Sequence, residues 1–203
     1  MWWGRCALSD PAIALLEFDS ISAGIVAGDA MVKTSPLGGI YAGTVHPGKY
    51  LVLVSGDTAS VEEALAAGTE VGSGHVTDTV FLPDIHPDVT RAIVGGKKRA
   101  RLRDEALGIV ETSTVAAVID AADAGVKAAH VKVSSVRLAD GLGGKGYVLF
   151  AGPVAEVEAA VESGVARCEP HGSLVRSDVI AQLHGEMAEN LESDLRFLKQ
   201  VED

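Results

Sequence analysis

The glycine-rich segment 141–146 is the first candidate for chemistry, because GLGGKG fits the dinucleotide-binding pattern G-x-G-x-x-G. That pattern holds a pyrophosphate only where a helix follows it directly. Here residues 147–150 (YVLF) follow, which is typical of a strand, and no Ser or Thr follows Lys145 as a P-loop requires. The segment is therefore interpreted as a flexible turn that another group can approach closely.

The histidines do not indicate a metal site within one chain. They form no i, i+4 pair and have no cysteine companion; they are His46, His75, His86, His130, His171 and His184. The sequence also lacks a G-x-S-x-G motif, a Cys–His signature and a carboxylate pair in a catalytic context. Glu17 and Glu111 occur in matching contexts, which favours a structural role. We therefore predict that the protein is not an enzyme.

The composition excludes several classes of partner. A formal net charge of −11 argues against nucleic acid, which requires a basic surface. No apolar run approaches the roughly 18 residues that span a membrane, and the N-terminus does not resemble a signal peptide. Cys6 and Cys168 are too few for a disulfide framework. We expect a soluble protein in a reducing compartment, with no membrane partner.

The chain contains one unit twice. Residues 106–127 repeat residues 12–33 at an offset of 94 residues, and Gly144-Lys145 repeats Gly48-Lys49 at an offset of 96. The two extra residues are therefore predicted between Lys127 and the second turn. The repeat predicts two domains, 12–86 and 106–184, joined by a linker, 87–105, and followed by an amphipathic C-terminal helix, 185–203. The basic run within 97–103 is interpreted as a solvated part of the linker, the alternative being a site for an anionic partner.

Each unit predicts the order β-α-β-β-α-β, with Ser20 or Ser22 capping the first helix and Thr58 the second. The fold class is α/β (α+β), a ferredoxin-like plan in which two helices cover one face of a small mixed sheet. The predicted elements of the first copy are 13–18, 21–33, 38–42, 50–54, 59–71 and 76–82. Those of the second copy are 107–111, 114–128, 131–138, 147–151, 154–166 and 174–180.

The repeated unit resembles the bacterial microcompartment (BMC) shell domain. ALGIVET and a helix ending DAADAGVKAAHV carry the resemblance, with GGKGYVLFAGPVAEVEAAVESG and degenerate equivalents in the first copy. It covers nearly all of residues 12–184. Two such domains in unpermuted strand order resemble the tandem (BMC-T) shell proteins. The IHP, VHPGKY and GLGGK segments are similar to segments of the tandem shell proteins of propanediol-utilisation compartments.

This resemblance implies a structural role. Members of the tandem type form a homotrimer with six domains in a ring, a pseudohexameric tile that packs beside other shell proteins in the bacterial cytoplasm and encloses enzymes. It implies that Lys33 and Lys127 lie at the tile edge. It further implies that two turns line a central pore for small metabolites; these residues are Val45, His46, Pro47, Gly48, Asp140, Gly141, Leu142, Gly143 and Gly144.

The sequence departs from the family at two places. His46 stands where the propanediol relatives carry a cysteine that binds an iron–sulfur cluster, and three imidazoles disfavour a [4Fe–4S] cluster. An unliganded, pH-responsive pore histidine and a divalent metal ion both stay open. Residues 181–184 (AQLH) replace a Pro-Arg-Pro-His segment whose Arg crosses the tile edge, so that contact cannot be carried over. Two other functions also stay open: a shell protein with a metal or redox centre that passes electrons, and a ferredoxin-like regulatory protein that binds an effector.

Overall fold

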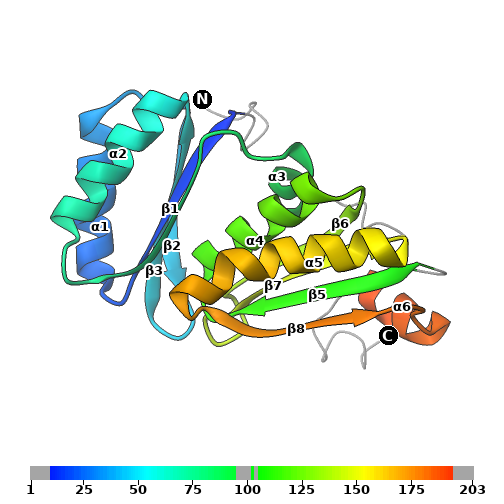
Figure 1. The fold of residues 1–203 in the computed structure, drawn as a ribbon. Helices are drawn as coiled ribbons and strands as arrows, with labels where there is room; N and C mark the ends of the chain where they lie inside the picture. The colour runs from blue at the N-terminus through cyan, green and yellow to red at the C-terminus, as the bar shows by residue number, and fades with distance from the viewer. Residues whose placement is uncertain (1–9, 95–101, 103–104, 194–203) are drawn as a thin grey trace.

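The computed structural model describes residues 10–94, 102 and 105–193. The first domain contains two helices and four strands in the predicted order (Figure 1). They are β1 (Ala12–Phe18), α1 (Ile21–Thr34), β2 (Gly39–Val45), β3 (Lys49–Gly56), α2 (Thr58–Val71) and β4 (Val76–Leu82). The second domain repeats them as β5 (Ala106–Thr112), α4 (Val115–Ala128), β6 (Lys132–Leu138), β7 (Gly146–Gly152), α5 (Val154–Cys168) and β8 (Leu174–Ile180).

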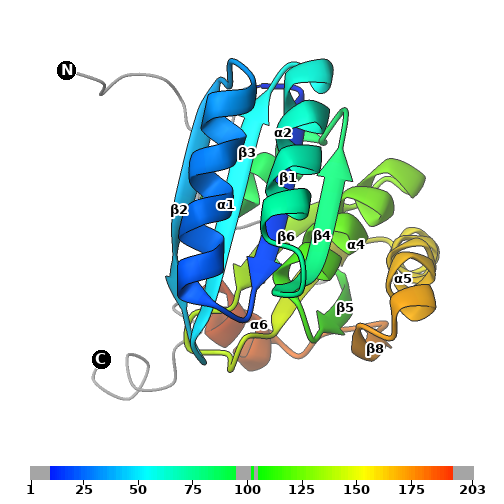
Figure 2. The same ribbon diagram turned by 90° about the vertical axis from the view of Figure 1, so that its left-hand side faces the viewer.

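Both sheets are antiparallel throughout, so the prediction of mixed sheets was wrong. The strand orders are β2-β3-β1-β4 and β6-β7-β5-β8. In each domain the first two strands of the chain run parallel, but the third strand lies between them. Parallel strands are therefore never neighbours, as in a ferredoxin-like sheet. Figure 2 shows α1 and α2 side by side on one face of the first sheet.

Side chains just before α1 and α2 cap the first turn of each of these helices. The Ser20 hydroxyl accepts a hydrogen bond from the Ala23 N–H at 3.3 Å, which caps α1 as predicted. The prediction that Thr58 caps α2 was wrong. Asp57 is the cap, because its carboxylate lies one residue earlier and accepts from the Ser60 N–H at 3.0 Å.

The two extra residues of the second copy lie within its turn. The strand pairing aligns Leu138–Gly146 with Thr44–Tyr50, so the offset is still 94 at the end of β6 and becomes 96 at the start of β7. The prediction that placed the insertion before the turn was therefore wrong. A bulge between Val133 and Ser135 interrupts the pairing of β6 with β7. At this bulge the Ser134 hydroxyl is buried without a hydrogen-bond partner.

Large and small residues exchange places between the two cores. At Gly24 of α1 a Cβ would lie 2.5 Å from the Tyr50 ring, and the equivalent pair is Val118 with Gly146. At Gly125 of α4 a Cβ would lie 2.4 Å from the Phe150 ring, and the equivalent pair is Met31 with Val54. Each core is therefore filled by partners that changed size together.

A short helix follows the last strand of each domain. Helix α3 (Pro87–Ile93) lies in the predicted linker, and its Val89 is fully buried. Helix α6 (Gly185–Glu192) packs on its own subunit, where Ala188 joins a cluster with Leu107, Leu149 and Leu183. The basic run and the rest of the predicted C-terminal helix, including Leu195 and Leu198, lie outside the described residues. Within the described ranges, no helix is long and apolar enough to cross a membrane.

Candidate functional site: the domain junction and the two turns

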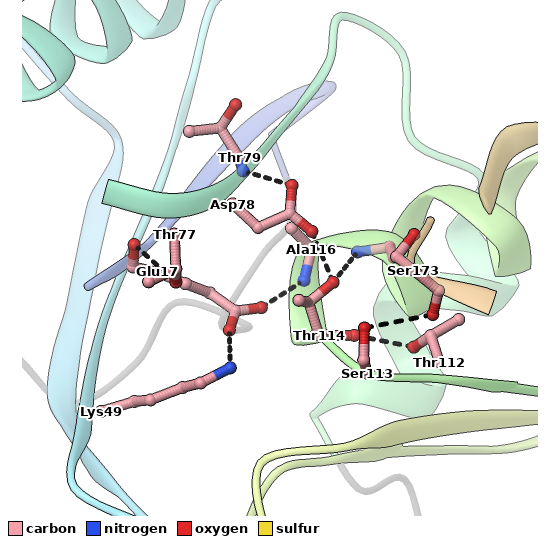
Figure 3. A network of polar contacts seen from close by, with 11 residues as sticks. Glu17, Lys49, Thr77, Asp78, Thr79, Thr112, Ser113, Thr114, Ala116 and Ser173 are labelled. Atoms are coloured by element: carbon pink, nitrogen blue, oxygen red, sulfur yellow. Dashed lines mark hydrogen bonds and ion pairs between the residues drawn. The ribbon is translucent and has the colours of Figure 1, made fainter. Parts of the chain in front are cut away.

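Glu17 joins the two domains. Its side chain is 0% exposed, and its Oε1 accepts a hydrogen bond at 2.8 Å from the backbone N–H of Ala116, in the first turn of α4 (Figure 3). Its Oε2 lies 3.1 Å from Lys49 Nζ. Burial raises the pKa of this carboxyl above 4.5, although the Ala116 N–H and Lys49 act in the opposite direction.

Asp78 extends this contact on the neighbouring strand. Asp78 pairs with Glu17 in the β1–β4 register, and its carboxylate accepts a hydrogen bond from the Thr114 hydroxyl (Figure 3). The same hydroxyl oxygen accepts from the Ala117 N–H at 3.3 Å and so caps α4. Residues of the first domain therefore hold the start of the second domain's first helix.

A second polar contact secures the far end of α4. Asp123 is buried, and its carboxylate accepts from the His86 N–H at 2.7 Å and from Lys127 Nζ at 2.6 Å. Lys127 also donates to the backbone carbonyl of Asp84. Both Asp84 and His86 follow β4, so the first domain contacts α4 at its two ends.

Apolar side chains fill the space between these polar contacts. On α4, Val115 and Ile119 are fully buried and Val126 is 8% exposed. On β4, Val80 and Leu82 are 5% and 6% exposed and belong to the same cluster. This cluster spans both domains and makes the junction a continuous part of the core.

The counterpart of this buried face is exposed on α1. Ile21, Ile25 and Val32, which match Val115, Ile119 and Val126, are 43%, 54% and 43% exposed. The equivalent polar side chains are also more exposed. Asp29 matches Asp123 and is 57% exposed, and Glu111 matches Glu17 and is 33% exposed. One chain thus contains this junction once. It also carries the two surfaces of a second junction, one on each domain, and these surfaces do not contact each other.

The two predicted pore turns lie against each other. In the first, the Gly48 N–H bonds to the Val45 carbonyl at 3.0 Å, around a cis His46–Pro47 peptide. In the second, a Cβ at Gly144 would lie 3.1 Å from Pro47 Cδ. Gly144 has φ +85°, which favours glycine, so its conformation and the close approach of Pro47 both disfavour a side chain there.

The structure brings the nine predicted turn residues into one region. His46, Asp140, Gly141 and Gly143 are exposed, and Leu142 is half-buried. The lysines predicted at the tile edge differ from each other. Lys33 is exposed and pairs with Asp29 at 2.5 Å, whereas Lys127 pairs with Asp123 and reaches the first domain of its own chain.

The junction residues were not singled out from the sequence. Asp78 carried no motif, and Glu17 and Asp123 were noted only as repeated residues. The signal that could have found them is the repeat, because Asp29 and Asp123 match in the two copies. Among the residues that the structure describes, no group of three His, Cys, Asp or Glu side chains could hold a metal ion.

Comparison with known proteins agrees with this geometry. The family model for the BMC domain matches residues 12–85 and 106–183. The bacterial microcompartment shell protein PduT of Citrobacter freundii is 40% identical over 176 residues, 87% of this chain and 95% of that protein. The shell protein EutM of Escherichia coli K12 is 41% identical over 85 residues, 42% of this chain and 86% of that protein.

Solved structures show the same fold. A microcompartment protein from Desulfitobacterium hafniense superposes with a TM-score of 0.76 and 38% identity, over 89% of this chain and 99% of that one. The fused permuted hexameric shell protein MSM0275 superposes with a TM-score of 0.56 at 20% identity, over 77% of this chain and 81% of that one, which shows the fold alone. Two BMC domains, joined through Glu17 and Asp123, place this chain in the family of bacterial microcompartment shell proteins, in the tandem type with two domains per chain.

Proposed function

We propose that three copies of the chain close into a ring of six domains, which forms one tile of a microcompartment shell. The observation that carries this proposal is the exposed face of α1, whose counterpart on α4 is buried by the first domain of the same chain. An interface whose two halves lie on different parts of one chain is heterologous, and repeating it gives a closed ring or an open filament. Closure after three copies is the form that the family resemblance implies.

The contacts between copies follow from those within one chain. The second domain of one copy takes the place of the first domain in the junction, and the first domain of the next copy takes the place of the second. Three of the intrachain bonds then have a counterpart at the matching residues. These counterparts are Glu111 with the Ser22 N–H, Asp29 with the His184 N–H, and Lys33 with the Gln182 carbonyl.

The turns support a central pore in this ring. Within one chain the second turn lies against Pro47. Among the described residues, apart from its two chain neighbours, no atom lies within 4 Å of a Cβ placed at Gly48, the equivalent of Gly144. Gly48 is therefore free to receive the second turn of the next copy. Alternation of the two turns around the axis places His46 and Asp140, both exposed, at the rim of the hole. A rim of imidazole and carboxylate groups suits small polar metabolites.

We further propose that the protein contributes structure and passage, without catalysis. The buried polar groups of the junction are engaged in holding the two domains together. A tile of this kind contacts other shell proteins at its outer edges and enclosed enzymes at one face. We infer this division of roles from the chain's membership of the shell-protein family.

Substitutions of Ile25 and Ile119, which hold equivalent places on α1 and α4, test the ring. Ile25→Glu places a charge on the open face and is expected to give a folded monomer. Ile119→Glu places the charge inside the intrachain junction and is expected to unfold the chain, because an unpaired buried charge costs several kcal/mol. Light scattering after size exclusion gives the mass, and circular dichroism gives the fold. A wild-type chain that stays monomeric would contradict the proposal, and so would an Ile25→Glu trimer as stable as the wild type.

A further inference from the structure

The two junctions of the proposed ring differ in charge at one pair of positions. In the first domain Asp78 pairs with Glu17 in the β1–β4 register, and in the second domain Arg176 pairs with Glu111 in the β5–β8 register. An aspartate and an arginine therefore hold the same place on the two edge strands. The surface that contacts β4 must therefore suit a negative charge, and the surface that contacts β8 must suit a positive one.

Asp78 meets hydroxyl groups of the second domain within the chain. Its carboxylate binds the Thr114 hydroxyl, and the residue before Thr114 is Ser113, whose hydroxyl bonds to the Ser173 carbonyl (Figure 3). The partner surface offers the hydroxyl groups of Thr114 and Ser113 there.

The first domain offers an acid at the matching place. Ser20 caps α1 as Thr114 caps α4, and the preceding residue is Asp19 in place of Ser113. The Asp19 side chain is 58% exposed and lies 2.9 Å from His75 Nδ1. Arg176 is 72% exposed, and Asp178 holds its guanidinium group with bonds of 2.6 and 2.9 Å. The surface that faces Arg176 in the ring thus carries Asp19 where the surface facing Asp78 carries Ser113.

We propose that Arg176 of each copy forms an ion pair with Asp19 of the next copy, and that this pair sets the alternating order of domains in the ring. This inference rests on the proposed trimer. Two wrong pairings are disfavoured by the same residues. A first domain docked on another first domain brings Asp78 against Asp19, two carboxylates. A second domain docked on another second domain leaves Arg176 facing Ser113, without an acid. Charges at an interface select partners chiefly through such repulsion and mismatch.

Charge exchange tests this pair. Arg176→Asp and Asp19→Arg each place like charges across the junction, and each is expected to raise the trimer dissociation constant about tenfold or more at low salt. The double variant restores opposite charges in reversed positions and is expected to recover most of the wild-type affinity. Raising the salt concentration is expected to weaken the wild-type trimer and to reduce the difference between the wild type and the single variants.

Arg167→Asp is the matched control. Arg167 is also an exposed arginine, paired with Asp120 at 3.0 Å in its own chain, and it lies on α5, whereas Arg176 lies on β8. It changes the net charge by the same amount and is expected to leave the trimer unchanged. Circular dichroism of each variant shows whether the fold is kept, and Arg176→Gln with Asp19→Asn provides a neutral pair should a charge reversal fail to fold.

The outcomes separate this inference from the proposed function. Analytical ultracentrifugation of the full chain gives the dissociation constants. A wild-type trimer that the single exchanges do not weaken, or that the double exchange does not recover, overturns the Arg176–Asp19 pair and leaves the ring intact. A wild-type chain that forms no trimer overturns the ring itself.

Discussion

At the scale of single residues, Glu17 and Glu111 show how one repeated residue acquires two environments. Both lie on the first strand of a domain and both pair with a lysine, Lys49 at 3.1 Å and Lys145 at 2.8 Å. Glu17 is covered by the second domain, whereas Glu111 remains 33% exposed. The difference arises from what covers each residue, because both occupy the same place on the first strand of a domain.

The raised pKa of Glu17 gives a prediction about pH. A carboxyl whose pKa is higher in the folded chain than in the unfolded one binds its proton more readily when folded. Its stabilising contribution is therefore present below pH 4.5, the unfolded value, and is lost as the pH rises through the folded pKa. Glu17→Gln lacks this titration. The stability of the wild type relative to Glu17→Gln is expected to fall as the pH rises from about 4 through the raised pKa.

Urea unfolding followed by circular dichroism at a series of pH values measures this difference. Both proteins should carry Ile25→Glu, so that dissociation of the trimer does not enter the result. A difference that stays constant or grows with pH would show that Glu17 titrates no higher in the folded chain than in the unfolded one.

At the scale of helices and strands, the two copies keep one framework and vary the packing within it. Val54 and Met31 of the first core correspond to Phe150 and Gly125 of the second. A Cβ at Gly125 would lie 2.4 Å from Phe150 Cζ and 2.9 Å from the Ala160 carbonyl oxygen. The aromatic ring thus occupies the space that a side chain at position 125 would need.

This exchange predicts a coupled pair of substitutions. Phe150→Val removes buried volume and is expected to cost on the order of 2–3 kcal/mol of unfolding free energy. Gly125→Met alone overpacks the core and is expected to cost roughly 1–3 kcal/mol or more. The double variant reproduces the first domain's pair and is expected to be more stable than the sum of the single losses allows. Denaturant unfolding of the four proteins gives the coupling energy.

Gly28→Ala, on α1, measures the effect of replacing a helical glycine where the added side chain meets no crowded neighbour. A Cβ at Gly28 would lie 3.5 Å from Val52 Cγ2, an ordinary contact, and Ala122 already occupies the equivalent place in α4. Alanine is expected to stabilise α1 by up to about 1 kcal/mol through helix propensity. Additive effects of Gly125→Met and Phe150→Val would contradict the shared-volume explanation.

The helices and strands were predicted from the sequence more fully than the turns and the contacts between the domains. The strands 76–82 and 174–180 were predicted with the bounds that the structure shows, because Pro83 and the hydrophobic pattern limit them. The place of the two-residue insertion was not predictable from the offsets at Lys127 and Lys145. The bulge beside Ser134 lies between these positions, and only strand pairing can assign a residue to a bulge or to a turn.

The domain junction could not be predicted either, because it also depends on contacts between residues far apart in the sequence. Asp29 and Asp123 each precede a lysine by four residues, and both pairs form, at 2.5 and 2.6 Å. Only Asp123 also receives the His86 N–H, from a residue 37 positions earlier in the chain. A pattern within one helix cannot show which of two equal helices another domain will cover.

At the scale of the whole molecule, the chain holds one complete junction and two halves of another. The complete junction shows which contacts a neighbouring copy can make, and the Asp78–Arg176 exchange shows where the two junctions must differ. The turns, which lie against each other near Gly144, differ in length by two residues between the copies. In the proposed ring, the framework would therefore determine assembly, while the turns would be available to adapt the pore.

The chemistry of the turns gives a last prediction, about an iron–sulfur cluster on the ring axis. Such clusters are held by cysteine thiolates, and the first turn carries His46 instead. The described cysteine, Cys168, is buried, and burial raises its pKa to about 11, which keeps it a neutral thiol. Protein purified without oxygen is expected to be colourless, with no iron in proportion to the chain. Visible absorption and elemental analysis check this expectation, and His46→Ala purified in parallel is the control. A band that the wild type shows and His46→Ala lacks would mean that the turn binds a coloured metal centre.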